Sequence, residues 1–316
     1  MKTKWLIGLM MLFFAGWSAG TARANFVLED TGHLDVTTSH DTGVLWNSST
    51  ADVLTGGYIG YAYVNDEATL HVLKLQGTSR ESVRNLYAYD MSTVDISGAV
   101  DNNYYGTVSY LTAYAKSTVN ISGGRVGRYL YAYGSSVVNV SGGDVNDYLN
   151  ACDSSTVNVS GGEVGNQINA SATSTVDISG GLVAYLNVSA TSTVDISGGL
   201  VGTLITENAS TVDISGGLVG NLYAYNPSTV TLHGYDFRAT GGLTLDGDNV
   251  LGTGVLTGRW YGPDDTMWAM TISGNAAGAT ILAIPEPATL SLLALGGLAM
   301  MRRGPGRKPK TPRKAR

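Results

Sequence analysis

One phrase recurs along most of this chain: Ser-Thr-Val, then Asp or Asn, then Ile or Val, then Ser-Gly-Gly. Its valine recurs at spacings of 25, 19, 19, 19, 18, 18 and 18 residues, at Val94, Val119, Val138, Val157, Val176, Val194, Val212 and Val230. A repeat this short cannot bury an apolar face alone, so such repeats are stable only when they stack on one another. The period therefore indicates a solenoid.

Within each repeat the apolar residues alternate at period two, first as Val-x-Ile and again as Leu-x-Ala, which is the spacing of β-strands. Stacking the repeats about 4.8 Å apart gives inward columns. Examples are Val176, Val194 and Val212; Ile178, Ile196 and Ile214; and Leu186, Leu204 and Leu222. The sequence predicts an all-β fold, a parallel β-solenoid (β-helix) of 18–19-residue coils. Weaker copies upstream bring the expected number to roughly ten or eleven coils, and we expect right-handed coiling.

The repeat predicts a solenoid domain over residues 25–234 and a small C-terminal β cap over residues 235–284 that covers the last open edge. Strands of the cap are expected at Gly254–Thr257, Trp268–Ile272 and Ala279–Ala283. The Gly-Gly pairs fit corners that need positive φ. Extra residues at 73–82 and 99–107 predict loops that bulge from the stack.

The N-terminus has the pattern of a signal peptide. Lys2 and Lys4 precede an apolar run over residues 5–17, and Ala22 and Ala24 occupy the positions that signal peptidase reads. We expect residues 1–24 to be removed before Asn25 and the protein to be secreted. A membrane anchor is the alternative, but the run is short for a bilayer of roughly 30 Å.

The C-terminus has three parts in order. Pro285-Glu286-Pro287 is followed by an apolar stretch over residues 288–301, then by Arg302-Arg303 and a basic tail. The stretch is shorter than the roughly 20 residues of a stable span, and the arginines favour a cytoplasmic tail.

Together the three parts resemble the PEP-CTERM sorting signal of Gram-negative bacteria that make exopolysaccharide, and the resemblance covers residues 285–316. It implies transient recognition by an exosortase, cleavage near Pro-Glu-Pro, and display on the outer surface or release into the matrix. Before processing, the short helix is the one segment expected in the membrane. The tail is longer than is usual in the family, so a retained charged anchor remains an alternative.

Charge excludes one class of partner. The chain has a formal net charge of −6, and residues 25–284 carry 24 acidic against eight basic side chains. Such a surface repels phosphate backbones, so no nucleic-acid partner is expected. The single cysteine, Cys152, forms no internal disulfide.

The residue between Val and Ile is expected to point outward, giving a polar column of Asp95, Asn120, Asn139, Asn158, Asp177, Asp195 and Asp213. Asparagines in register form amide ladders. Asp177, Asp195 and Asp213 are candidate Ca²⁺ ligands, although the second ligand of calcium-binding β-roll repeats is missing and a solvated acidic face is the alternative. No other cofactor or metal is expected. The four histidines, which are His33, His40, His71 and His233, are scattered without metal-ligand spacing.

The Leu-Tyr-Ala-Tyr strands predict two further outward columns. One holds Tyr87, Tyr131 and Tyr223, and the other holds Tyr89, Tyr114, Tyr133 and Tyr225. Exposed tyrosines in rows are candidate platforms for sugar rings. The alternative is cross-strand aromatic stacking that stiffens the sheet.

The sequence favours a non-catalytic, structural or adhesive protein of the extracellular polysaccharide or biofilm matrix, with exopolysaccharide as the candidate partner. Basic residues are scarce in the coils, and no pair of carboxylates is placed to act as acid and base. The alternative is a polysaccharide lyase or glycoside hydrolase whose site lies in the inserted loops near residues 99–107.

Overall fold

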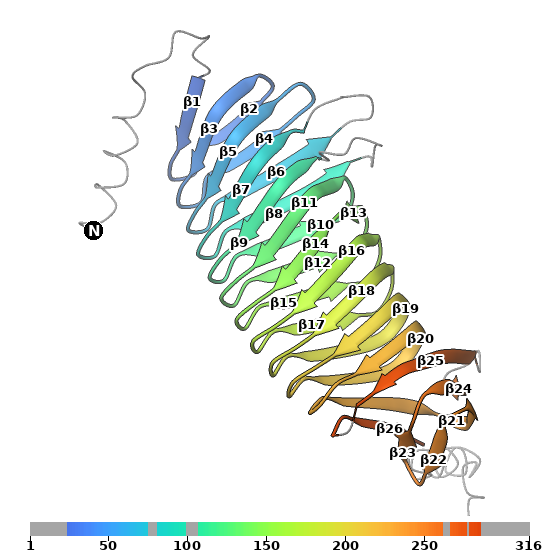
Figure 1. The fold of residues 1–316 in the computed structure, drawn as a ribbon. Coiled ribbons are helices and arrows are strands. Elements are labelled where there is room, and N and C mark those ends of the chain that lie inside the picture. Colours follow the sequence, from blue (N-terminus) through green and yellow to red (C-terminus); the bar gives the residue numbers. More distant parts are fainter. Residues whose placement is uncertain (1–23, 75–80, 99–106, 262–265, 277, 286–316) are drawn as a thin grey trace, which may run out of the picture.

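The computed structural model describes residues 24–74, 81–98, 107–261, 266–276 and 278–285. Every regular element in these ranges is a strand, and parallel pairing between successive coils builds an elongated stack (Figure 1). The stack has about ten turns of about 19 residues. The predicted parallel β-solenoid is confirmed.

The Val-x-Ile motif forms one face of the stack, called here the Val-x-Ile face. Its strands pair in register, so that Val157, Val176 and Val194 stand opposite one another. The strands are β2 (His33–Val36), β4 (Thr50–Val53), β6 (Thr69–Lys74), β8 (Thr93–Gly98), β10 (Thr118–Ile121), β12 (Val137–Val140), β15 (Thr156–Val159), β17 (Thr175–Ile178), and the first parts of β19 (Thr193–Thr206), β20 (Thr211–Ala224) and β21 (Thr229–Gly241).

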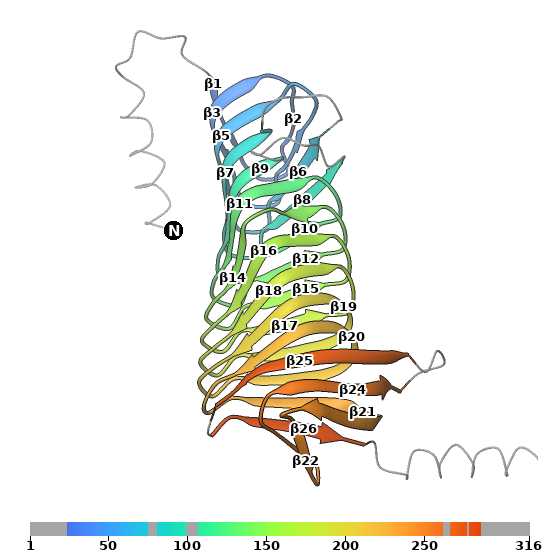
Figure 2. The ribbon, with the colours of Figure 1, turned by 45° about the vertical axis from the view of Figure 1, so that its right-hand side comes forward.

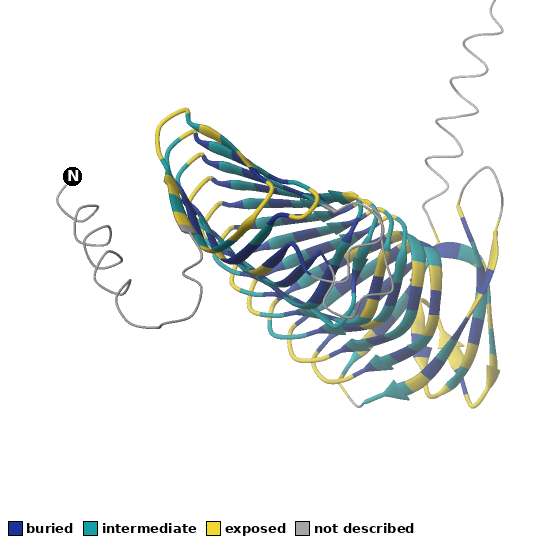
Figure 3. Ribbon diagram, turned by 90° about the horizontal axis from the view of Figure 1, so that it is seen from above, coloured by how far each residue is buried: buried dark blue, intermediate teal, exposed yellow. Residues whose placement is uncertain are grey.

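The Leu-x-Ala motif forms a second face, called here the Leu-x-Ala face. Its strands are β1 (Ala24–Leu28), β3 (Ser39–Leu45), β5 (Tyr58–Val64), β7 (Val83–Ala88), β9 (Val108–Ala113), β11 (Arg125–Ala132), β14 (Tyr148–Ala151), β16 (Glu163–Ala170), β18 (Leu182–Val188) and the last parts of β19 and β20. Figure 3 shows buried positions alternating mainly with intermediate ones along both faces.

Each later coil also has a short segment between the two faces that is not predicted from the sequence. In one coil it is the separate strand β13 (Asp144–Val145), which pairs with the start of β11 and of β16. Its valine is buried in every coil from β11 to β20: Val126, Val145, Val164, Val183, Val201 and Val219. These valines close the third side of the interior.

The interior contains about five apolar side chains per coil. In one coil these are Val176, Ile178, Val183, Leu186 and Val188, none of them more than 1% exposed. The serine that begins the repeat phrase forms an additional buried column, which hydropathy alone does not reveal: Ser92, Ser117, Ser136, Ser155, Ser174, Ser192, Ser210 and Ser228. The hydroxyls of Ser192 and Ser228 donate to the carbonyl three residues earlier, 2.6 Å away in both cases, whereas Ser174 Oγ accepts from the Ser171 amide at 3.1 Å. A small side chain with a local acceptor can be buried at little cost.

The Gly-Gly corners require glycine for two different reasons. The second glycine has positive φ, between 67° and 78° in the six pairs from Gly124 to Gly217, which confirms that part of the prediction. The first glycine is needed because the neighbouring coil is close. A Cβ on Gly161 would lie 2.4 Å from the Ser141 carbonyl oxygen.

The cap contains the three strands that the sequence predicts. They are β24 (Gly254–Trp260), β25 (Met267–Asn275) and β26 (Thr280–Ile284), accompanied by the hairpin of β22 (Thr244–Asp246) and β23 (Asn249–Leu251). β24 runs antiparallel to β21 and β25, whereas β25 and β26 run parallel to β20 and β21 and continue the coil register (Figure 2). The cap therefore forms the last layer of the stack.

Both predicted processing segments lie mainly outside the described residues. The signal peptide falls on residues 1–24, of which Ala24 alone is described, as the first residue of β1. Of the sorting residues Pro285 is described and is exposed, while Glu286, Pro287, Arg302 and Arg303 are not described. The described part of the chain contains no apolar helix of membrane-spanning length. The inserted loops, at residues 75–80 and 99–106, also lie outside the described ranges.

Candidate functional site

Tyrosines gather on the outside of the Leu-x-Ala face in three neighbouring columns. The two predicted columns are present, and Tyr63 extends the first of them by pairing in register with Tyr87. A third column, two residues before the first on the same strands, contains Tyr110, Tyr129 and Tyr148 in register. The tyrosine cluster, as used below, comprises the residues whose rings stack on one another: Tyr63, Tyr87, Tyr89, Tyr110, Tyr114, Tyr129, Tyr131, Tyr133 and Tyr148.

The rings of the cluster lie face to face along the rod. Tyr89 and Tyr114 have ring centroids 5.0 Å apart at 5°, and Tyr114 and Tyr133 are 5.5 Å apart at 14°. Parallel rings at this separation are in contact, so a sugar ring cannot enter between them. Edges and hydroxyls are the parts of the cluster that face outward. The geometry matches the stiffening ladder better than a row of open aromatic platforms.

Tyr223 and Tyr225 follow the same columns but do not belong to the cluster. Four coils separate them from it, where the columns contain Asn150, Asn169, Asn187 and Ile205, and Cys152, Ser171, Ser189 and Glu207. The Nδ2 of Asn169 donates to Asn150 Oδ1 at 2.8 Å, so an amide contact replaces ring stacking there. The seven predicted tyrosines therefore form two surfaces: five lie in the cluster and two beside the cap.

Burial raises the pKa of three hydroxyls in the cluster, those of Tyr63, Tyr89 and Tyr133. The neighbouring tyrosines raise the pKa of all three further, because two phenolates in contact would repel each other. These hydroxyls stay neutral at physiological pH, and a neutral hydroxyl can both donate and accept hydrogen bonds.

Three of the few basic residues in the coils make structural contacts. Arg128 donates from Nη1 to the Tyr110 hydroxyl at 2.7 Å, with its guanidinium 5.5 Å from the centre of that ring. Arg125 pairs across coils with Asp144 at 2.8 Å, and Arg84 pairs with Glu81 at 3.0 Å. The loop at residues 99–106, where the enzyme alternative places its site, is outside the described residues.

The polar column on the Val-x-Ile face contains the predicted amide ladder. Asn120 donates to Asp95 at 2.7 Å, Asn139 to Asn120 at 2.8 Å, and Asn158 to Asn139 at 2.8 Å, each through Nδ2. Four successive coils are linked in this way.

Asp177, Asp195 and Asp213 continue this column, one per coil and in register. The pKa of Asp195 is raised, first by burial and then by the charges of Asp177 and Asp213 on either side. The predicted Ca²⁺ site at these residues stays a prediction.

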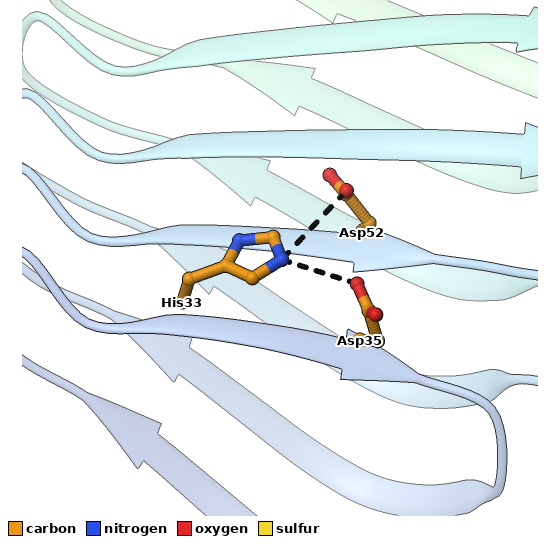
Figure 4. A group of neighbouring side chains, drawn as sticks. All are labelled: His33, Asp35 and Asp52. Carbon is orange, nitrogen blue, oxygen red and sulfur yellow. Dashed lines mark hydrogen bonds and ion pairs between the residues drawn. The ribbon is translucent and has the colours of Figure 1, made fainter.

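The histidines have no metal-ligand spacing in the sequence, but the fold places His33 beside two carboxylates. Its Nε2 lies 3.1 Å from Asp35 Oδ1 and 3.9 Å from Asp52 Oδ2, while its Nδ1 lies 2.8 Å from Thr50 Oγ1 (Figure 4). Among the described residues these three form the one group of His, Cys, Asp or Glu whose ligand atoms all gather within 4.8 Å. The signal in the sequence is a His-x-Asp strand followed one coil later by an aspartate, in a coil where the repeat is degenerate.

No family model matches this chain, and no curated protein and no solved structure is similar to it.

Proposed function

We propose that this protein is a structural or adhesive rod, secreted and sorted to the surface of a Gram-negative bacterium, where it belongs to the extracellular polysaccharide matrix and has no catalytic role. The observation that carries the proposal is the outward pairing of side chains from coil to coil. Tyrosine rings of successive coils stack at 5.0 to 6.0 Å along one face, and amides form hydrogen bonds along the other.

These ladders give the rod a mechanical role. Each cross-coil pair adds a small stabilisation to the hydrogen bonds of the sheet, and the pairs repeat along the stack. Bending the rod separates stacked rings and stretches amide hydrogen bonds, so both faces resist bending.

The same repetition supports adhesion. The tyrosine cluster turns neutral hydroxyls and ring edges outward at each of several coils, and a glycan presents hydroxyls at regular intervals. Many weak contacts on one rigid surface give a strong total attachment, although each contact alone is weak.

The proposed sorting is compatible with the bounds of the described strands. β1 begins at Ala24, so a cleavage before Asn25 removes only its first residue, and a cleavage near Pro285 falls after the end of β26 at Ile284. Signal peptidase and exosortase would therefore leave the coils and the cap nearly whole.

Adhesion is tested with the full mature chain immobilised on a surface and exopolysaccharide from its host in solution. Changing Tyr131 and Tyr133 to Ala should weaken retention about tenfold, whereas changing both to Phe keeps the stacked rings and tests the hydroxyls alone. Tyr185→Ala is the matched control, because this tyrosine lies on the same face between Gln167 and Thr203 in register. Unchanged retention by the double Ala variant would remove adhesion and leave the stiffening role.

Sorting is tested by mass spectrometry of both ends of the protein from its native host. We expect an N-terminus at Asn25 and a C-terminus near Pro285. A chain that keeps residues 288–316 on the cell would establish a retained anchor in place of exosortase processing.

A further inference from the structure

We propose that His33, Asp35 and Asp52 form a binding site for a divalent transition-metal ion, with Zn²⁺ as its best-matched occupant. The site lies on β2 and β4 of the Val-x-Ile face, near the N-terminal end of the stack (Figure 4), whereas the tyrosine cluster is on the Leu-x-Ala face.

The fold brings the three residues together in two steps. His33 and Asp35 are two residues apart on β2, so their side chains leave the same face of the strand. The parallel register of β2 and β4 then places Asp52 opposite Asp35, and Thr50 opposite His33. The coil spacing thus supplies the third ligand and the residue that orients the first.

The separations suit a metal of this size. Zn²⁺ binds imidazole nitrogen and carboxylate oxygen at about 2.0 to 2.2 Å, so two ligand atoms of a tetrahedral site lie roughly 3.4 Å apart. The Nε2 of His33 lies 3.1 Å from one carboxylate oxygen and 3.9 Å from the other. Rotations of the exposed His33 and Asp35 side chains and of the half-buried Asp52 side chain would bring both distances to this value.

Thr50 orients the His33 ring without binding the metal itself. Its Oγ1 lies 2.8 Å from His33 Nδ1, and a hydrogen bond at Nδ1 directs the opposite nitrogen, Nε2, toward the two carboxylates. Metal-bound histidines are commonly held in this way. The carboxylates balance the charge of a divalent ion, and the exposed position leaves room for water as the remaining ligand.

The neighbouring histidines show what distinguishes this group. His71 lies 3.0 Å from Asp95 and His233 lies 3.4 Å from Asp213, each paired with one carboxylate of the polar column. Only the His33 group offers one imidazole nitrogen and two carboxylates among the described residues. This mixed set favours Zn²⁺ and similar ions over Ca²⁺, which prefers oxygen ligands in larger numbers.

The location gives the ion a structural consequence. In the described chain β2 pairs with β4 alone, so the first strand of this face is held from one side only. A metal that joins side chains of β2 and β4 would fasten the end coil to the coil above it.

The test is titration of the metal-free mature chain with Zn²⁺ by calorimetry, together with hydrogen exchange of the peptides that contain β2 and β4. We expect one bound Zn²⁺ per chain and slower exchange in both strands. His33→Gln should weaken binding at least tenfold, and Thr50→Val about tenfold to a hundredfold. His233→Gln is the matched control, because this histidine pairs with one aspartate of the polar column far from β2 and β4, and it should leave binding unchanged.

A double variant, Asp35→Asn with Asp52→Asn, separates a built site from adventitious binding to one exposed histidine. It keeps His33, so loss of Zn²⁺ binding supports the proposal, and unchanged binding overturns it. Binding of Ca²⁺ in preference to Zn²⁺, or no Zn²⁺ bound at millimolar metal, would also overturn it. Circular dichroism of each variant checks that the stack is folded.

Discussion

The coils and the cap bury their apolar surface with different side chains. In the coil that contains β17 and β18, the interior is built from valine, isoleucine and leucine, whereas the cap buries Trp260, Trp268 and Met270. Trp260 and Trp268 stack at 4.5 Å, and the Trp260 Nε1 donates to the Gly217 carbonyl at 2.8 Å.

The difference follows from the number of neighbours. A side chain in a coil must fit between copies of itself about 4.8 Å above and below, so its size is fixed by the stack. The cap meets a coil from one side only, which frees it to use broad aromatic rings. Strand β24 of the cap also runs antiparallel to β21. It therefore does not extend the parallel pairing of the coils, and it protects the edge of the stack.

The largest expected effect comes from removing an aromatic ring of the cap. Trp260→Ala should cost about 3 to 5 kcal/mol of the free energy of unfolding, because it leaves a cavity and an unpaired carbonyl at Gly217. Hydrogen exchange should become faster in β20 and β21 and stay unchanged in β10. Equal acceleration in β10 would mean that cap and coils unfold as one unit.

A second comparison uses the glycines. Gly161→Asn should cost about 3 kcal/mol, because its Cβ would meet the Ser141 carbonyl of the neighbouring coil. Gly247→Asn in the β22–β23 hairpin should change stability by less than about 0.5 kcal/mol, since nothing lies within 4 Å and asparagine tolerates its φ of 58°. Chemical denaturation of both variants measures the difference, and similar losses would contradict the close approach of coils.

Alkaline pH should weaken the tyrosine coils before the cap. The pKa values of Tyr89 and Tyr133 are raised in the folded state, so the stability they contribute is full below the unfolded value near 10 and is lost as pH rises through the folded values. Thermal unfolding measured from pH 8 to pH 11 should show this loss. Changing both residues to Phe should reduce it, and an identical pH profile would argue against the shifts.

The smallest effect is expected at Asp195. Its pKa is raised, so the ionised form disfavours the folded state, and stability falls as pH rises through the folded pKa. Asp195→Asn should therefore stabilise the protein slightly at pH 7, by less than about 1 kcal/mol because the site is exposed and screened. The gain should vanish near pH 3, and a gain that persists there would assign it to a new amide hydrogen bond.

Much of the fold follows from the repeat. A fixed period together with strand alternation determines which residues share a column, so the positions of Val176, Val194 and Val212 and of the asparagine ladder can be predicted. Side-chain pairing within one column follows as soon as the register is known.

What the sequence did not reveal depends on geometry within a coil. The column of Tyr110, Tyr129 and Tyr148 lies two residues before the first predicted column, at a point where a register shift interrupts the alternation in later coils. The His33 group requires the register of the first two coils, where the phrase is too degenerate to align by its letters. The turns that precede the Val-x-Ile strands from β2 to β20 each contain a residue with positive φ, such as Asp66, Asp153 or Ala172. Most of these residues are not glycine, so the sequence gives no obvious signal of their conformation.

One feature of the coils bears on how such a chain changes between generations. Residues 174–183, 192–201 and 210–219 form three identical ten-residue segments, and the strands β17, β19 and β20 place them in register. Tandem copies of this kind invite unequal recombination, and a whole unit gained or lost shifts neither the columns nor the cap. Each event would lengthen or shorten the rod by about 4.8 Å, so the length of the rod would be inherited as a whole number of coils.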